Sequence, residues 1–430
     1  MMFAATCRRW AGLVTLVFGG FSVGQAQVAP AVASLATSPL ETLTPGAATN
    51  FRLFPSAFYA NQLFLLGEAH GVAKPQEVDF DLLRHLNERA GVRYYLAEVD
   101  AAKAFFLNEY LRTGQDSTLR RVFASWVATN AQWANQDFLN KIKKIRTLNA
   151  TLPARRQIHF LGIDEMQDAT LVAAGLRALL PPAAPAGVRQ AIDSVAALLG
   201  QPLTSRLAAT ARRASAALAQ AHHTVPAATY DELTAILAEA TDYPSRQGRE
   251  VALFTNFERL LQTKRLRHEK LYGMWGLYHV LQRPLLNGGA AFAAQVRASS
   301  LPLHHKVASV LCVFAGCQML YPTAALPAPL QAAGQRYTVT SMFNHDGPLV
   351  TINGLAALKA RTAPTSLTLL PLAGPQALAV RYAPGLPADQ QLRFNPQVPA
   401  CDYVQYLVLV RGSGAVTPLA AVPGEGGAAE

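Results

Sequence analysis

The sequence predicts an α/β protein with a mostly parallel central sheet flanked by helices and an inserted Ala-rich helical region. Of its 430 residues, 51% are apolar, so the chain can bury a large core. Short apolar runs alternate with helix-length stretches along most of the chain, which is typical of a sheet covered by helices. The first two runs are joined by one predicted helix, and a strand–helix–strand unit makes its two strands parallel.

Each predicted strand is a short apolar run bounded by glycine or polar residues. These runs are residues 63–66, 92–99, 158–163, 270–275, 307–314, 337–343 and 405–410. After the first run, Pro75 can begin a helix and Gly91 can end it, because these residues are favoured at the two helix termini. Residues 171–240 are rich in Ala and Leu and form the predicted helical insertion.

The N-terminal segment has the pattern of a secretory signal peptide. Arg8 and Arg9 precede an apolar run at residues 10–23, which is too short to cross a bilayer. The small residues that end at Ala26 are typical of a signal peptidase cleavage site. We therefore expect residues 1–26 to be removed and the protein to be periplasmic or secreted. An uncleaved N-terminal anchor is the alternative.

After the signal peptide, we expect a single catalytic domain. Residues 27–50 are mostly Ala, Pro, Ser and Thr, a composition that buries little surface, and we predict a linker there. The domain is predicted to span residues 51–420, with the helical insertion at about 171–240. Residues 421–430 are rich in Gly and Ala and are predicted to be a disordered tail. We expect no stable membrane span in the mature chain.

Polar side chains lie at or just after the carboxyl ends of four of the predicted strands. They are Glu68, His70, Glu98, Asp164 and His279. Because the carboxyl ends of parallel strands meet at one edge of a sheet, neighbouring strands would bring these groups into one site for a small-molecule substrate. An imidazole titrates near neutral pH, so we predict that His70 is a general base. Either Glu68 or Glu98 could bind its second ring nitrogen.

Two helical patterns add candidate substrate-binding residues. Trp126, Asn130 and Trp133 are spaced four and three residues apart, so one helix face could present two indoles and an amide. Plain core packing is the alternative for this group. Arg249 and Asn256 are seven residues apart and share a face of another predicted helix. The arginine could bind a carboxylate, phosphate or oxyanion, or remain solvated.

Several classes of function lack support in the sequence. The formal net charge is +11, but the basic residues are scattered and no nucleic-acid-binding motif is present, so we expect no nucleic-acid partner. The sequence also lacks a Gly-x-Ser-x-Gly elbow, a phosphate-binding loop, a His-Glu-x-x-His motif and a dinucleotide fingerprint. A serine nucleophile and a nucleotide cofactor are therefore not expected.

Taken in order, these motifs resemble the erythromycin esterase-like family, which lies in a superfamily with TIKI-type metalloproteases and ChaN-type haem-binding proteins. The resemblance rests on Gly67-Glu68-Ala69-His70-Gly71, Glu98-Val99-Asp100, Gly162-Ile163-Asp164 and the helices carrying Trp126 to Trp133 and Arg249 to Asn256. It implies that His70 activates water for ester hydrolysis and that the glutamates after the first two strands orient or tune it. Arg249 and His279 would hold the substrate or stabilise the oxyanion, with Asp164 in support.

This chain departs from the erythromycin esterases in two places. The family usually has one more residue between the glutamate and the histidine of the first motif, and the first histidine of its later pair is Gly276 here. The spacing found, Gly67-x-x-His70 and Gly276-x-x-His279, is similar to that of TIKI-type proteins. In that alternative, His70, His279 and Glu98 would bind Mn, Co, Zn or Fe. A ChaN-type haem or iron site without turnover is the other alternative, and no cofactor is favoured.

Overall fold

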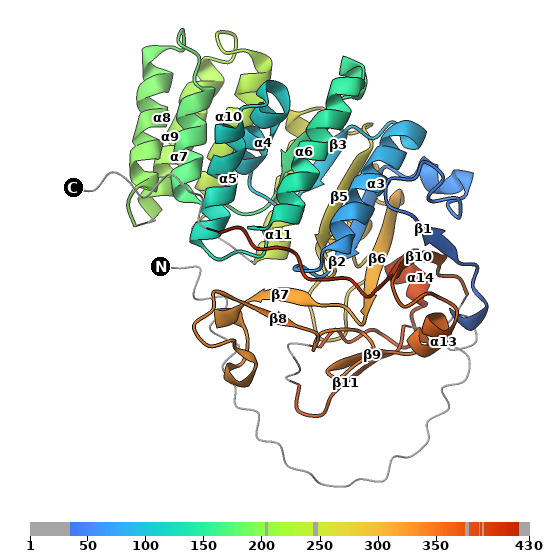
Figure 1. Ribbon diagram of the computed structural model, residues 1–430. Coiled ribbons are helices and arrows are strands. Elements are labelled where there is room, and N and C mark those ends of the chain that lie inside the picture. Colours follow the sequence, from blue (N-terminus) through green and yellow to red (C-terminus); the bar gives the residue numbers. More distant parts are fainter. Residues whose placement is uncertain are drawn as a thin grey trace.

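A computed structural model of the protein describes residues 35–202, 205–243, 248–374, 378–386, 388 and 391–420. The predicted signal peptide and C-terminal tail lie outside these residues. Within the described chain, eight strands form one sheet in the order β1-β10-β12-β6-β2-β5-β3-β4 (Figure 1). They are β1 (Glu41–Leu43), β2 (Leu63–Glu68), β3 (Tyr94–Ala97), β4 (His159–Gly162), β5 (Leu271–Gly276), β6 (Val307–Ala315), β10 (Ser366–Pro371) and β12 (Tyr406–Arg411).

The sheet is mostly parallel, as predicted. The five pairings that link β12, β6, β2, β5, β3 and β4 are all parallel. Only the edge formed by β1, β10 and β12 is antiparallel. The strands β2, β5, β3 and β4 are therefore consecutive neighbours, and their carboxyl ends lie at the same edge of the sheet.

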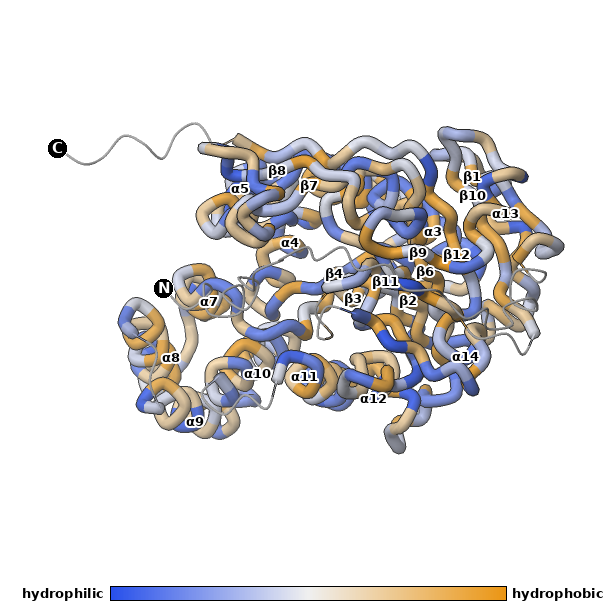
Figure 2. The backbone as a smooth tube through the Cα atoms, turned by 90° about the horizontal axis from the view of Figure 1, so that it is seen from below, coloured by the Kyte–Doolittle hydropathy of each residue, from blue (hydrophilic) through white to orange (hydrophobic). Residues whose placement is uncertain are grey.

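Helices cover both faces of the sheet and extend beyond one edge (Figures 1 and 2). They are α3 (Lys74–Ala90), α4 (Ala101–Thr113), α5 (Asp116–Ala128), α6 (Gln136–Thr151), α7 (Ala169–Leu179), α8 (Ala186–Leu199), α9 (Ser205–Gln220), α10 (Ala227–Asp242), α11 (Arg249–Thr263), α12 (Phe292–Ala298), α13 (Leu355–Ala360) and α14 (Ala400–Tyr403). Short 3-10 helices lie at Ser56–Ala60, Ala154–Arg156, Thr323–Ala325 and Ala328–Leu330.

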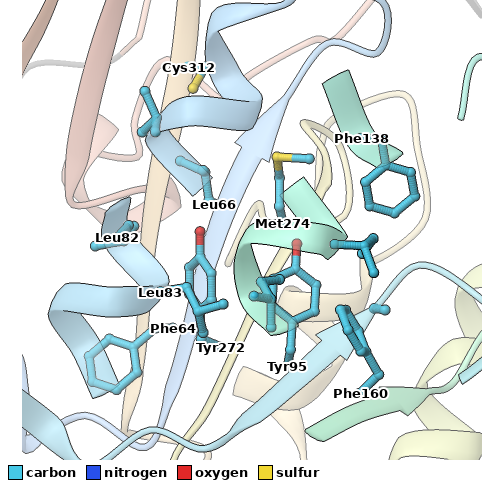
Figure 3. Close-up of a cluster of buried hydrophobic side chains, with 14 of the residues drawn as sticks. Phe64, Leu66, Leu82, Leu83, Tyr95, Phe138, Phe160, Tyr272, Met274 and Cys312 are labelled. Atoms are coloured by element: carbon cyan, nitrogen blue, oxygen red, sulfur yellow. The ribbon is translucent and has the colours of Figure 1, made fainter. Parts of the chain in front are cut away.

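The alternation of side chains along β2 produces two cores. Phe64 and Leu66 point to the face covered by α3 and α6, in the cluster drawn in Figure 3. Leu63 and Leu65 point to the opposite face and share a core with Phe257 of α11. Because successive side chains of a strand point to opposite faces, a strand buried on both faces reads as one continuous apolar run. This is the pattern from which the strand was predicted.

The helix α3 begins and ends as the sequence predicts. Pro75 lies in its first turn, and Gly91 caps its carboxyl end with a left-handed φ of 74°. Glycine adopts this conformation without the steric cost that a side chain would add. The helix therefore carries the chain from the end of β2 back to the start of β3.

The predicted helical insertion consists of α7, α8, α9 and α10. These helices share a core of their own, which also includes residues of α4. In Figure 2, α8 and α9 lie at the side of the molecule away from β1 and β10. None of the helices in the described part of the chain is long and apolar enough to cross a membrane.

Two sequence predictions about the edge of the fold are wrong. Part of the predicted linker at residues 27–50 is ordered, because β1 pairs with β10 and buries Leu43. Glu41 in this strand accepts backbone hydrogen bonds from Arg52 and Leu53 at 2.9 and 3.0 Å. The predicted strand at residues 337–343 does not join the main sheet.

That strand is β8 (Tyr337–Thr340), which pairs with β7 (Met319–Pro322) in a separate antiparallel ribbon. A second ribbon consists of β9 (Val350–Ile352) and β11 (Val380–Tyr382). Both ribbons are short and partly exposed. A short apolar run has the same sequence pattern in such a ribbon as in the main sheet, so the sequence could not distinguish the two.

Candidate active site

The polar residues predicted from the strand ends lie together at the carboxyl edge of β2, β5, β3 and β4. Glu68 is the last residue of β2 and is paired in register with Gly276, the last residue of β5. Glu98 follows β3, and Asp164 follows β4. The backbone N–H of Gly276 donates to Oε2 of Glu98 at 2.9 Å, which joins two of the strand ends directly. The predicted adjacency is therefore present.

His70 is held by a sharp turn after β2. The next residue, Gly71, has a φ of +91°, and a Cβ there would lie 2.2 Å from the carbonyl oxygen of Leu320. Only glycine fits this approach, so the backbone fixes the direction of His70. Its Nδ1 is hydrogen-bonded to Oε1 of Glu68, and its Nε2 lies 3.9 Å from Oε1 of Glu98. Glu68 is thus the carboxylate partner that the sequence left open.

His70 remains accessible to a small molecule. Its side chain is 26% exposed, whereas Glu68 is fully buried beneath it. The indole of Trp133 packs against the imidazole with ring centroids 4.3 Å apart. The imidazole therefore has one nitrogen on a buried carboxylate, an aromatic neighbour at its side and a second nitrogen facing the other charged groups.

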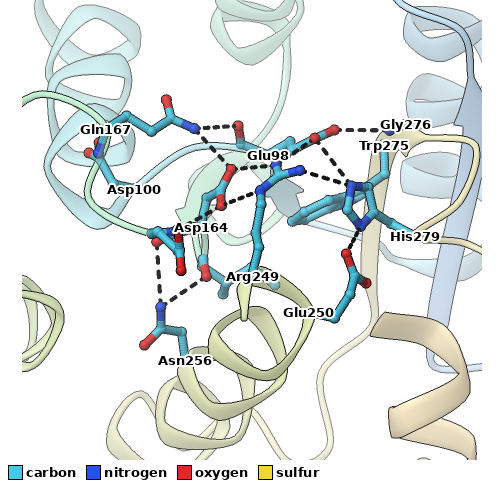
Figure 4. Close-up of polar contacts among 12 residues, drawn as sticks. Glu98, Asp100, Asp164, Gln167, Arg249, Glu250, Asn256, Trp275, Gly276 and His279 are labelled. Atoms are coloured by element: carbon cyan, nitrogen blue, oxygen red, sulfur yellow. Dashed lines mark hydrogen bonds and ion pairs between the residues drawn. The ribbon is translucent and has the colours of Figure 1, made fainter. Parts of the chain in front are cut away.

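Arg249 links the remaining acidic residues (Figure 4). Its Nε and Nη2 donate to the two oxygens of Asp164 at 3.0 and 2.7 Å. Nη2 also donates to Oε1 of Glu98 at 2.7 Å, and Nη1 donates to Nε2 of His279 at 3.0 Å. A guanidinium has five N–H groups, and four are used here, so one N–H on Nη1 has no acceptor among the described residues.

His279 faces the same centre from the turn after β5. Because a guanidinium can only donate, the contact with Arg249 requires Nε2 of His279 to be the acceptor. Its Nδ1 lies 2.7 Å from Oε1 of Glu250, a residue of the first turn of α11. The two histidines therefore each have one carboxylate at Nδ1, and their Nε2 atoms lie 3.9 and 3.6 Å from the same oxygen of Glu98.

The charges at this edge of the sheet shift the pKa values of its members. Burial lowers the pKa of His70, but the negative charges of Glu68 and Glu98 outweigh burial and raise it to about 9. Burial raises the pKa of Glu98, but the neighbouring positive charges, of which Arg249 contributes most, outweigh burial and lower it to about 2. At neutral pH, the resting site therefore contains an imidazolium at His70 and a carboxylate at Glu98.

The predicted helix face carrying Trp126, Asn130 and Trp133 is wrong. The helix α5 ends at Ala128, and Asn130 has a left-handed φ of 53°, so the three residues do not share a face. Trp126 is buried in the core against Phe138. Asn130 accepts a hydrogen bond from the side chain of Arg336 at 2.7 Å. Of the three, only Trp133 contacts His70.

The predicted face shared by Arg249 and Asn256 is present in α11. Asn256 donates to the backbone carbonyls of Ile163 and Asp164 at 3.0 and 3.4 Å rather than to the charged side chains. It therefore anchors α11 to the turn that carries Asp164. Sequence reasoning missed Glu250, because adjacent residues of a helix point about 100° apart and only Arg249 was assigned to the site. It also missed Gln132, whose side chain donates to the backbone carbonyl of His70 at 3.2 Å.

The donor set does not fit the divalent metal that the TIKI-type alternative requires. Both oxygens of Glu98 already accept N–H groups, from Arg249 and from Gly276. Nε2 of His279 accepts from the same guanidinium. A metal ion would have to displace a cation that is bound to two of its three expected ligands. Among the described residues, no group of three His, Cys, Asp or Glu side chains is arranged to hold a metal ion.

Fold and site together define an α/β protein with an acid–base centre at the carboxyl edge of a parallel sheet. Residues 87–273 match the model of the erythromycin esterase family, which confirms the resemblance predicted from the sequence. The matched segment includes Glu98, Asp164 and Arg249, whereas His70 and His279 lie outside it. No curated protein matches the chain significantly in sequence.

Three solved structures share the fold across nearly their whole length. A Bacillus cereus protein is 13% identical with a TM-score of 0.64, and the match covers 90% of this chain and 99% of that one. A succinoglycan biosynthesis protein is 14% identical with a TM-score of 0.64, covering 92% and 100%. A mutant of the erythromycin esterase EreC, in its open conformation, is 12% identical with a TM-score of 0.59, covering 87% and 98%. At these identities, the likeness concerns the fold alone.

Proposed function

We propose that the protein is a hydrolase that cleaves an ester or related acyl bond with a water molecule activated by His70. The observation that carries this proposal is the pairing of His70 with Glu68. One imidazole nitrogen is bound to a buried carboxylate, and the ring is 26% exposed beside a charged centre. A carboxylate in this position orients the imidazole and stabilises the charged form that results from proton abstraction. The family match supports a hydrolase at the level of the family.

In the proposed reaction, neutral His70 accepts a proton from water at Nε2 as the water oxygen attacks the acyl carbon. The carbonyl oxygen becomes an oxyanion, and the unused N–H on Nη1 of Arg249 donates to it. When the tetrahedral intermediate collapses, His70 returns the proton to the leaving alcohol oxygen. Glu98 and Asp164 hold the guanidinium in place for this step. His70 has then returned the proton that it accepted and is neutral again.

His279 has a different place in this proposal from the one that the family resemblance implies. Its Nε2 accepts from Arg249, so this nitrogen has no proton to give to an oxyanion. We therefore assign the contact with the oxyanion to Arg249. The role of His279 is to accept a hydrogen bond from the guanidinium and so fix its position. Trp133 supplies an apolar surface beside His70 for the neighbouring part of the substrate. The periplasmic or secreted location is proposed from residues 1–26 of the sequence alone.

The proposal predicts that activity rises with pH through the alkaline range. His70 must be neutral to accept a proton, and its pKa is raised to about 9, mainly by Glu68 against the effect of burial. Below that pH, kcat/KM should rise about tenfold per pH unit, because the neutral fraction does. Glu68→Gln removes the negative charge that raises the pKa of His70. In this variant, the rise of kcat/KM with pH should therefore occur at lower pH. The check is kcat/KM from pH 6 to 10.

The control for the charge change is Glu77→Gln. This glutamate is exposed on α3, and its removal should leave the pH profile unchanged. A wild-type profile that is flat between pH 7 and 9 would contradict the assignment of His70 as the base.

Hydrolysis of an ester panel by the purified mature protein tests the function itself. We expect release of the carboxylic acid and the alcohol above the buffer rate, with one acid formed per ester consumed. The same assay after dialysis against EDTA should give the same rate, because the guanidinium occupies the expected metal position. Activity that is lost to EDTA and restored by Mn, Co, Zn or Fe would favour the metal alternative. A Soret band on haem titration, without hydrolysis of any ester, would favour the haem alternative.

A further inference from the structure

A second histidine–carboxylate pair lies opposite His70 and Glu68, in residues to which the family resemblance assigns no such pairing. Nδ1 of His279 lies 2.7 Å from Oε1 of Glu250, and Figure 4 shows the carboxylate at the far side of the ring from Arg249. In the resting geometry, this is an ion-pair distance without the alignment of a good hydrogen bond. Contacts of this kind often tighten only when the substrate is bound.

The two sides of the His279 ring impose one tautomer. On one side, Arg249 can only donate, so Nε2 must accept. On the other side, an ionised Glu250 can only accept, so Nδ1 must carry the proton. A neutral imidazole has one donor and one acceptor nitrogen, and this tautomer presents the matching nitrogen to each neighbour.

Glu250 is itself fixed by the start of α12. Its second oxygen, Oε2, accepts the backbone N–H of Phe292 at 2.7 Å. Its side chain is 21% exposed, and the neighbouring His279 is 9% exposed. One oxygen of the carboxylate therefore accepts from the backbone of α12, and the other lies at ion-pair distance from the imidazole.

We propose that Glu250 is a positioning residue that fixes the tautomer of His279 and, through it, the direction in which Nη1 of Arg249 points. With Nε2 of His279 as acceptor, one N–H of Nη1 is bound, and the other is held toward the substrate. The proposal rests on the proposed function for its effect on turnover, but its effect on the tautomer is independent of turnover. Glu250 touches neither the substrate nor the water in this scheme.

The variant Glu250→Gln tests the proposal because an amide cannot replace both carboxylate oxygens. The backbone N–H of Phe292 is a fixed donor, so it takes the amide oxygen and leaves the NH₂ group facing His279. Both neighbours of His279 are then donors, so the amide and Arg249 compete for the single acceptor nitrogen of the neutral ring. Under this proposal the amide prevails, the proton moves to Nε2, and Nε2–H faces the N–H of Arg249. Two donors that face each other cannot form a hydrogen bond. The guanidinium therefore loses His279 as a partner and keeps only its two carboxylates.

We expect Glu250→Gln to lower kcat by about 10- to 100-fold with a smaller change in KM, because the contact with the oxyanion is made in the transition state. The ¹⁵N spectrum of labelled histidine should show the His279 proton on Nδ1 in the wild type and on Nε2 in the variant. The signal is assigned by its loss in His279→Asn. Glu250→Asp keeps a carboxylate and should keep the wild-type tautomer and most of kcat.

The matched control is Glu258→Gln, two turns farther along α11, which should change neither the tautomer nor kcat. A Glu250→Gln variant that keeps the proton on Nδ1 overturns the proposal, whatever its rate. A variant in which the proton moves but kcat stays at the wild-type value also overturns the positioning role. If the wild type hydrolyses no ester, the proposed function fails, and the spectra still decide whether Glu250 sets the tautomer.

Discussion

His70→Ala is expected to lower kcat/KM for the best ester by about 10²- to 10⁴-fold, which is the usual contribution of a general base. Neither Glu98 nor His279 can replace it. Glu98 has a pKa of about 2 and both oxygens engaged, so it is a poor proton acceptor. His279 has its acceptor nitrogen bound to Arg249. The measurement is kcat/KM at the pH optimum of the wild type.

The loss should occur without unfolding, because the side chain of His70 lies in a turn at the surface of the site and is 26% exposed. The removal does, however, leave Glu68 buried without its ion-pair partner, so a modest loss of thermal stability is expected. His305→Ala, an exposed histidine far along the sequence, is the control for the loss of an imidazole and should leave activity unchanged. Unchanged turnover in His70→Ala would remove the central residue of the proposal.

The strand ends could be predicted from the sequence because each one couples an apolar run to a polar residue. Glu68, Glu98, Asp164 and His279 all follow such runs, and all four lie at the site. The order of the strands could not be predicted. The strand β5 lies between β2 and β3, although it comes much later in the chain. This insertion places the turn that carries His279 between the ends of β2 and β3, and it depends on packing between residues that are distant in sequence.

The missed features share a physical cause, which is that local spacing does not encode long-range partners. The three residues of β1 are ordered by pairing with β10, and Glu41 is buried because it accepts two backbone N–H groups. The turn at Asn130 breaks the predicted helix without a glycine or a proline nearby, since asparagine tolerates a left-handed backbone. Glu250 reaches His279 because α11 begins beside the turn that follows β5, which no helical periodicity reveals.

Arg249→Gln is expected to combine a loss of activity with a loss of stability. Removal of a single oxyanion donor costs about 10²- to 10³-fold in kcat. The substitution also leaves the buried carboxylates of Glu98 and Asp164 without their common cation. Breaking a buried ion pair costs about 3–5 kcal/mol, and because the Arg249 side chain is 40% exposed we expect roughly 1–3 kcal/mol instead. The measurements are kcat on the best ester and the free energy of unfolding in urea.

The pH dependence of this stability loss identifies its cause. The pKa of Glu98 is about 2 in the folded protein, against 4.5 as its ordinary value, and Arg249 is the largest of the charges that lower it. A carboxyl group whose pKa is lowered by folding stabilises the folded state above its unfolded pKa, and this contribution is lost as the pH falls toward the folded pKa. The difference in unfolding free energy between wild type and Arg249→Gln should therefore be largest above pH 4.5 and shrink toward pH 2.

Arg249→Lys separates charge from geometry at the same position. A lysine keeps the positive charge but cannot reproduce the two parallel N–H bonds to Asp164 and the further bonds to Glu98 and His279. We therefore expect it to recover part of the stability and little of kcat. Arg112→Lys, in an exposed pair with Glu109, is the control and should change neither quantity measurably. Full recovery of kcat by the lysine would show that positive charge alone is enough at this position, and it would contradict the role assigned to the free N–H of Nη1.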